Sequence, residues 1–75
     1  MADKTLDARN LMCPMPVLKT RKAMGELARD QTLELLATDP GSVADVKAFC
    51  EASGNVLLEV SESQGVFRFV IKRAA

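Results

Sequence analysis

The sequence predicts a two-layer α/β sandwich of the α+β type, with the order βαβαββ and two helices on one face of a four-stranded mixed sheet. Two observations support this fold class. Segments with apolar residues at helical spacing begin near Pro14 and Ser42, and each follows a short alternating segment. Two further alternating segments end the chain and are joined by Gln64-Gly65, which is typical of a β-hairpin. Two helices cover only one face of such a sheet, so we expect the other face to meet solvent.

The first strand and first helix are expected on either side of a loop from Arg9 to Met12. Thr5 to Ala8 alternates, which places Leu6 and Ala8 on one face of a strand. The helix is predicted from Pro14 to about Leu27, and Gly25 should end it between Met24 and Ala28. Its apolar stripe is predicted to contain Val17, Leu18, Met24, Leu27 and Ala28.

The second strand is predicted from Thr32 to Thr38, with Glu34 on the face opposite to its apolar residues Leu33, Leu35 and Ala37. Asp39-Pro40-Gly41 should end this strand, because proline has no N–H for the ladder and glycine favours a turn. The turn leads directly into the second predicted helix.

Ser42 is the expected N-cap of that helix, and Asp45 three residues later nearly matches a capping box. Gly54 suits the left-handed position after the helix end. The buried stripe should consist of Val43, Val46, Phe49 and Cys50. The hairpin strands then cover Val56 to Ser63 and Val66 to Lys72, and the last one has an apolar face of Phe67, Phe69 and Ile71.

Composition limits both the size and the partners of the molecule. The 75 residues, 48% of them apolar, predict one small domain over residues 1–75 with a modest core and surface chemistry. Ten basic and ten acidic residues cancel, which removes the positive field needed for nonspecific nucleic-acid binding. The chain shows neither an apolar run near the length of a membrane span nor a secretory leader, so we expect a cytoplasmic protein with protein partners.

The two cysteines restrict the chemistry further. Cys13 and Cys50 form neither a C-x-x-C pair nor a disulfide framework. The chain has no histidine, which excludes a Cys/His catalytic pair and most zinc sites within one chain. No cofactor is expected. Sulfur or disulfide exchange remains, because the attacking thiolate needs no general base of its own when the partner supplies the rest.

Cys13 is the candidate reactive residue. Pro14 and Pro16 suit a helix start, and a residue before proline is extended, so Cys13 should lie just outside the helix N-terminus. The positive end of a helix favours an anion, which predicts a Cys13 pKa below that of a free cysteine and faster alkylation than at Cys50. The alternative for Cys13 is simple packing. Cys50 is expected in the core, with a resolving role as its alternative.

Two segments resemble a known family. Asp7-Ala8-Arg9-Asn10-Leu11-Met12-Cys13-Pro14-Met15-Pro16 resembles the D-x-R-G-x-x-C-P-x-P signature of the TusA/SirA sulfur-carrier proteins. Thr38-Asp39-Pro40-Gly41-Ser42 resembles the second landmark of that family, and the resemblance covers essentially the whole chain. Asn10 and Asp30 stand where the family commonly has glycine, but both residue types tolerate positive φ, so the turns should survive.

The resemblance implies the same fold and a sulfur-relay function. Cys13 would accept a sulfane sulfur as a persulfide from a cysteine desulfurase or rhodanese-like donor, and pass it to a cysteine of an acceptor protein. The end uses that the resemblance implies are tRNA thiolation, molybdenum-cofactor synthesis or sulfur oxidation. The residues expected to support the geometry around Cys13 are Asn10, Pro14, Pro16 and Asp39.

Neighbours of Cys13 are candidate partner contacts. Met12 and Met15 flank it as soft apolar side chains, with packing as the alternative. Lys19, Arg21 and Lys22 lie within about two turns of it and would either steer an acidic partner or form a solvated face.

Two other functions stay open at this point. Cys13 would also suit a thiol-based redox or regulatory protein. A small nucleic-acid-binding module is the third reading, because two-layer domains of this shape resemble the C-terminal domain of translation initiation factor 3. Zero net charge and only three aromatic residues disfavour it.

Overall fold

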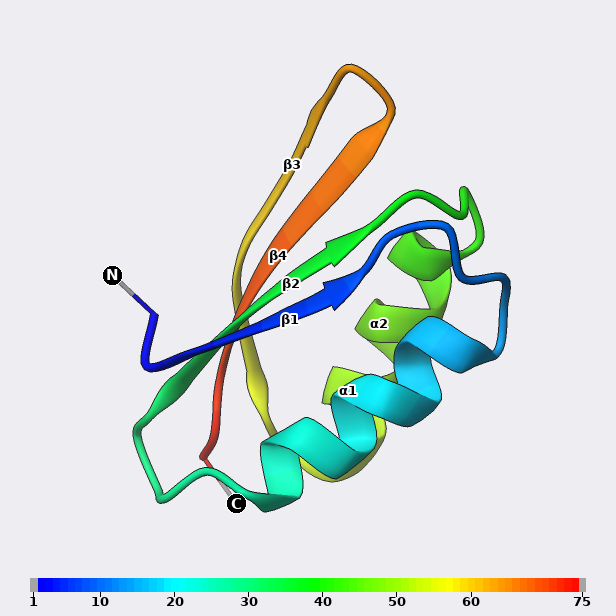
Figure 1. The fold of residues 1–75 in the computed structure, drawn as a ribbon. Helices are drawn as coiled ribbons and strands as arrows, with labels where there is room; N and C mark the ends of the chain where they lie inside the picture. Colours follow the sequence, from blue (N-terminus) through cyan, green and yellow to red (C-terminus); the bar gives the residue numbers. More distant parts are fainter. Residues whose placement is uncertain (1, 75) are drawn as a thin grey trace.

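The computed structural model describes residues 2–74 and has the predicted order of elements. Both helices lie on one face of the sheet (Figure 1), which confirms the two-layer fold class. The sheet has four strands in the order β1-β2-β4-β3, of which β1 and β2 are parallel and the other neighbours antiparallel. The elements are β1 (Lys4–Ala8), α1 (Met15–Gly25), β2 (Thr32–Ala37), α2 (Ser42–Ser53), β3 (Val56–Ser63) and β4 (Val66–Lys72).

The core lies between the sheet and the helices. Leu35 of β2 is in register with Phe69 of β4, and Leu33 with Ile71, so the predicted apolar faces of the two central strands coincide. These four side chains are fully buried. Burial of one such side chain stabilises the folded state by about 1.5–3 kcal/mol relative to leaving it exposed to water. The buried apolar residues are Ala8, Ala23, Met24, Leu27, Leu33, Leu35, Ala37, Val46, Cys50, Phe69 and Ile71.

Helix α1 ends at Gly25, within the predicted range, but its buried face differs from the prediction. Leu18 is 48% exposed and Ala28 is also exposed. The inward positions are Pro16, Thr20, Ala23, Met24 and Leu27. The hydroxyl of Thr20 donates to the carbonyl of Pro16 at 2.8 Å, which satisfies this polar group inside the core. Leu18 is therefore left on the outer side of the helix.

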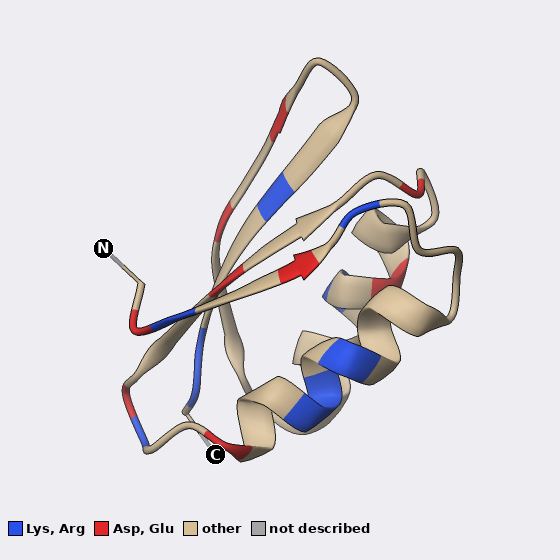
Figure 2. Ribbon diagram, in the orientation of Figure 1, with Lys and Arg blue, Asp and Glu red and all other residues tan. Residues whose placement is uncertain are grey.

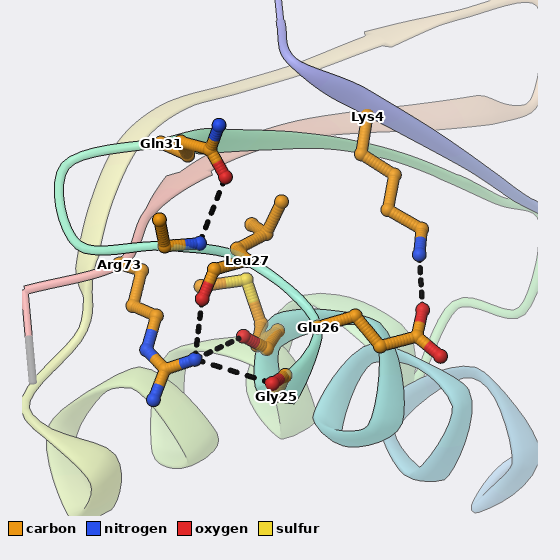
Figure 3. Close-up of polar contacts among 8 residues, drawn as sticks. Lys4, Gly25, Glu26, Leu27, Gln31 and Arg73 are labelled. Atoms are coloured by element: carbon orange, nitrogen blue, oxygen red, sulfur yellow. Dashed lines mark hydrogen bonds and ion pairs between the residues drawn. The ribbon is translucent and has the colours of Figure 1, made fainter.

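The end of α1 is held by a residue from the other end of the chain. Nη1 of Arg73 donates to the carbonyl oxygens of Met24, Gly25 and Leu27, and Figure 3 shows this side chain pointing at the end of the helix. A guanidinium group at a helix C-terminus satisfies carbonyls that have no intrahelical partner and complements the helix dipole. The last strand is thereby tied to α1.

Helix α2 begins differently from the prediction. Gly41 is the N-cap and Ser42 is the first helical residue, so the predicted serine cap and capping box are wrong. The N–H of Ser42 donates to the carbonyl of Asp39 at 3.0 Å, and the N–H of Asp45 donates to the carbonyl of Gly41 at 3.2 Å. Backbone carbonyls of the turn, and not side chains, therefore accept N–H groups at the start of the helix. The Ser42 side chain is buried, and the Asp45 carboxylate is free to turn elsewhere.

The predicted turns are confirmed. Gln64 and Gly65 have φ values of 52° and 80°, as a two-residue hairpin turn requires. Gly54 ends α2 with φ 81°. Asn10 and Asp30 have φ values of 67° and 70°, so both substitutes for the family's glycines adopt the left-handed region.

The other face of the sheet is not covered by helices (Figure 1) and carries a group of ion pairs. Arg68 of β4 pairs with Glu34 of β2 and, at 3.2 Å, with Glu59 of β3. The three side chains are partly exposed, which confirms that this face meets solvent. Among residues 2–74, no helix is both long and apolar enough to cross a membrane.

Candidate functional site

Cys13 lies in the connection between β1 and α1, directly before the helix. Pro14 is the N-cap and Met15 the first helical residue, so Cys13 precedes the helix as predicted. The Cys13-Pro14 peptide bond is cis. The backbone closes the start of the helix, because the N–H of Met15 donates to the carbonyl of Met12 at 2.8 Å and that of Leu18 to Pro14 at 3.1 Å. Cys13 is an exposed free thiol.

Asp39 joins the two loops that form the site. Its Oδ2 accepts the backbone N–H of Cys13 at 2.5 Å, and its Oδ1 accepts the N–H of Gly41 at 3.2 Å. The loops meet because β1 and β2 are parallel neighbours, so their carboxyl ends reach the same edge of the sheet (Figure 1). Asn10 adds a second link, since its N–H donates to Oγ1 of Thr38 at 2.9 Å. Asn10 and Asp39, two of the four residues predicted to support this geometry, therefore contact the opposite loop.

The two prolines have different surroundings. Pro14 is exposed beside Cys13, whereas Pro16 is buried in the first turn of α1 and its carbonyl accepts the Thr20 hydroxyl. Pro16 therefore anchors the start of the helix to the core. Pro14 lies at the surface, where it forms part of the lining next to the thiol.

Asp45 is the residue at this site that sequence reasoning assigned elsewhere. The Sγ of Cys13 donates to Oδ2 of Asp45 at 2.6 Å. The capping-box pattern pointed to a local role for Asp45, but helix α2 starts at the same sheet edge as α1. Because of that shared edge, the first turn of α2 faces the residue that precedes α1.

The pKa of the Cys13 thiol is raised, mainly by its hydrogen bond to Asp45 and then by loss of hydration. The negative charges of Asp45 and Asp39 raise it further. The prediction of a lowered pKa is therefore wrong. Two carboxylates from the β2 to α2 region oppose the thiolate.

Cys50 lies on the inner side of α2 and is only 5% exposed. Burial raises the pKa of its thiol, because the surrounding apolar residues disfavour the charged form. The predicted core position is confirmed, and the two cysteines lie in separate environments.

A groove of about 400 Å³ runs from Cys13 between α1 and α2. It begins at Cys13 and Asp45, near the starts of the two helices, and reaches Arg21 and Ala52 about two turns later. Most of its lining is apolar, and exposed Leu18 belongs to it. The lining residues are Cys13, Pro14, Val17, Leu18, Arg21, Asp45, Ala48, Phe49 and Ala52. Sequence periodicity placed Leu18 in the core, so it gave no signal for this groove.

The candidate partner contacts divide into two groups. Met12 and Met15 are 77% and 42% exposed, so neither packs in the core. All three basic residues of α1 are exposed, and Figure 2 shows positive residues along the helix. Arg21 lines the groove with Cys13, whereas Lys19 and Lys22 line a different hollow. In that hollow Lys4 pairs with Glu26 (Figure 3).

Comparison with known proteins gives a consistent result. The family model described as Sulfurtransferase TusA matches residues 4–73. The sulfur carrier protein TusA of Allochromatium vinosum is 44% identical over 72 residues, which make up 96% of this chain and 95% of that protein. The solved structure of a SirA-like protein from Desulfitobacterium hafniense has a TM-score of 0.84 at 26% sequence identity, and the match covers 96% of this chain and 99% of that chain.

The matched range contains every strand and helix, together with Cys13 and the loops around it. The name of the Allochromatium relative supports a sulfur-carrier role, and such a role implies proteins that give and receive sulfur. The chain belongs to the sulfurtransferase TusA family.

Proposed function

We propose that this protein accepts sulfane sulfur on Cys13 as a persulfide and passes it to a cysteine of an acceptor protein. The observation that supports this most is the position of an exposed thiol in the lining of a groove, in a chain of the TusA family. Exposure matters because the sulfur of a carrier has to meet the sulfur of another protein. Cys50 is buried and does not meet this requirement.

In the loading step, the Cys13 thiolate attacks the outer sulfur of a donor persulfide. A bond forms between Cys13 Sγ and that sulfur, the sulfur–sulfur bond of the donor breaks, and the donor cysteine leaves as a thiolate. In the second step, an acceptor thiolate attacks the outer sulfur on Cys13 in the same way. Each step exchanges one sulfur–sulfur bond for another, so neither needs an oxidant, a reductant or a cofactor.

The donor in this proposal is a cysteine desulfurase or a rhodanese-like protein, and the end uses are tRNA thiolation, molybdenum-cofactor synthesis or sulfur oxidation. Met12, Met15 and Arg21 are the proposed partner contacts, because all three are exposed around Cys13 or along its groove. Lys19 and Lys22 lie outside the groove and would act on a partner only through their charge. The proposed site of action is the cytoplasm.

A redox-regulatory function is less well supported. Redox-sensor cysteines have a low pKa and react with small oxidants from solution, whereas the carboxylates around Cys13 raise its pKa, which a docked sulfur donor offsets by its proximity. A nucleic-acid-binding function is also less well supported, because the net charge is zero and the open sheet face carries Glu34 and Glu59 beside Arg68.

The test is to incubate the protein with a cysteine desulfurase and cysteine, and separately with a rhodanese-type donor. Intact-protein mass spectrometry should show one added sulfur atom that a reductant removes. Cys13→Ser should abolish the addition, and Cys50→Ser should retain it. Failure with both donors, or an adduct that survives Cys13→Ser, would reject the proposal in favour of the redox-regulatory function.

A further inference from the structure

Cys13 is held by two carboxylates that contact different parts of the residue. Asp39 accepts its backbone N–H at 2.5 Å, and Asp45 accepts its Sγ–H at 2.6 Å. Asp39 belongs to the connection after β2, and Asp45 to the first turn of α2. The thiol is therefore fixed between the starts of the two helices, with its proton directed at α2.

The basic residues of this region are placed away from the sulfur. Arg9, on the same loop as Cys13, pairs through Nε and Nη2 with Asp7 at 2.9 Å in both contacts. Arg21 lines the groove about two helical turns further along α1. The charged groups that bear most directly on Cys13 are thus Asp39 and Asp45, and both are acidic.

We propose that Asp45 is a positioning residue that keeps Cys13 in its protonated thiol form and thereby protects it from small electrophiles until a sulfur donor docks. The part that concerns sulfur rests on the function proposed above. The hydrogen bond exists only in the thiol form, because a thiolate has no proton to donate. A thiolate in the same place would instead face a negative oxygen at contact distance. Both effects favour the thiol, and the raised pKa of Cys13 agrees with them.

A docked protein donor overcomes this protection by proximity. A persulfide held next to Cys13 acts at a far higher effective concentration than a small molecule in solution. A small sulfane donor has no such advantage, so its rate should depend directly on the fraction of Cys13 that is thiolate. Asp45 would therefore slow every reaction of Cys13 as a thiolate, and a docked donor would offset this loss by its high effective concentration.

Glutathione persulfide is a small donor that can transfer its outer sulfur to Cys13 by exchange of one sulfur–sulfur bond for another. Cys13 first releases its proton to solvent, and its thiolate attacks the outer sulfur of glutathione persulfide. A bond forms between Sγ and that sulfur, the sulfur–sulfur bond of the donor breaks, and glutathione leaves as a thiolate that takes up a proton. Removing the Asp45 charge makes the release of the Cys13 proton easier near neutral pH.

Asp45→Asn should change the pH profile of Cys13 in a specific way. Each unit by which the thiol pKa falls raises the thiolate fraction about tenfold near neutral pH. Intrinsic nucleophilicity falls with pKa, so the net gain in rate is about three- to fourfold for each unit. Above both pKa values the same variant should react more slowly than the wild type. The two profiles should therefore cross, which a purely structural disturbance would not produce.

The experiment measures the rate of Cys13 alkylation by iodoacetamide across the pH range, by intact-protein mass spectrometry in the Cys50→Ser background. Asp45→Asn preserves shape, Asp45→Ala removes the contact, and Glu51→Gln is the matched control. Glu51 lies on the same helix, is exposed, and lines a hollow next to Cys50 instead of the Cys13 groove. Both Asp45 variants should shift the profile to lower pH, and the control should not. Unchanged profiles, or an equal shift in the control, would overturn the proposal.

Loading by glutathione persulfide at neutral pH separates this proposal from the proposed function. Both Asp45 variants should load faster than the wild type, by a factor similar to that of alkylation. A shifted alkylation profile, with no persulfide on any variant from glutathione persulfide or from either protein donor, would leave the role of Asp45 intact and contradict the carrier function. Persulfide on Cys13 with unshifted profiles would contradict the role of Asp45 alone. Circular dichroism confirms that each variant is folded.

Discussion

Cys13 and Cys50 belong to the same chain, and both have a raised pKa for different reasons. Apolar packing around Cys50 disfavours its thiolate, whereas Cys13 is exposed and faces two carboxylates. The same direction of shift therefore has different consequences. Only Cys13 is accessible to another protein, and only its pKa depends on contacts that a single substitution can remove. Accessibility, more than acidity, distinguishes the reactive thiol here.

The largest expected difference is the rate of labelling. Iodoacetamide should modify Cys13 in the folded protein at least about a hundredfold faster than Cys50, because Cys50 reacts only after α2 separates from the sheet. Peptide mapping after limiting reagent measures the ratio. In urea the two cysteines should react at similar rates, which serves as the control. Equal labelling in the folded state would contradict the claim that Cys13 is accessible and Cys50 is not.

Substitution should affect the stability of the fold more at Cys50 than at Cys13. Cys50→Ser places a hydroxyl in the core and should lower the free energy of unfolding by about 1–3 kcal/mol. Cys13→Ser changes an exposed side chain and should alter it by no more than about 0.5 kcal/mol. Urea denaturation followed by circular dichroism compares both variants with the wild type. A larger loss for Cys13→Ser would show that the exposed site supports the fold more than the buried one does.

A smaller effect concerns the ion pair that precedes Cys13. Its hydrogen bonds to Arg9 lower the pKa of Asp7 from 3.8 to about 2. A carboxyl group with a lowered pKa stabilises the folded state above its unfolded pKa, and this contribution is lost as the pH falls from about 4 to 2. Asp7→Asn should therefore flatten the pH dependence of unfolding in that window. Arg9→Gln should do the same, and an unchanged slope in both variants would refute the pairing.

Much of the fold was predictable because local signals agreed with one another. Alternation marked the strands, Gln64-Gly65 marked the hairpin and Gly54 marked the end of α2. The buried face of α1 was predicted incorrectly because Pro16 is both a helix-start signal and an inward-facing residue, and the sequence pattern indicates only the first. Thr20 was missed because it is polar. A backbone acceptor in the helix makes its burial possible, and composition does not reveal that acceptor.

The site was predictable where it depended on one stretch of chain. Cys13, its exposure and its place before α1 follow from the cysteine and the prolines around it. The pattern around Asp45 predicts a local cap, whereas its contact with Cys13 depends on β1 and β2 being parallel neighbours. The sign of the Cys13 pKa shift was missed for the same reason, since the opposing carboxylates come from a distant part of the sequence.

The most direct test of the account is the location of the added sulfur in the wild-type protein, where both cysteines compete. After incubation with a cysteine desulfurase and cysteine, the persulfide should be trapped by alkylation before unfolding and mapped by peptide mass spectrometry. We expect the extra sulfur on the Cys13 peptide and an unmodified Cys50 peptide. Extra sulfur on Cys50, or equally on both, would contradict the central claim that exposure at the groove makes Cys13 the sulfur-carrying residue.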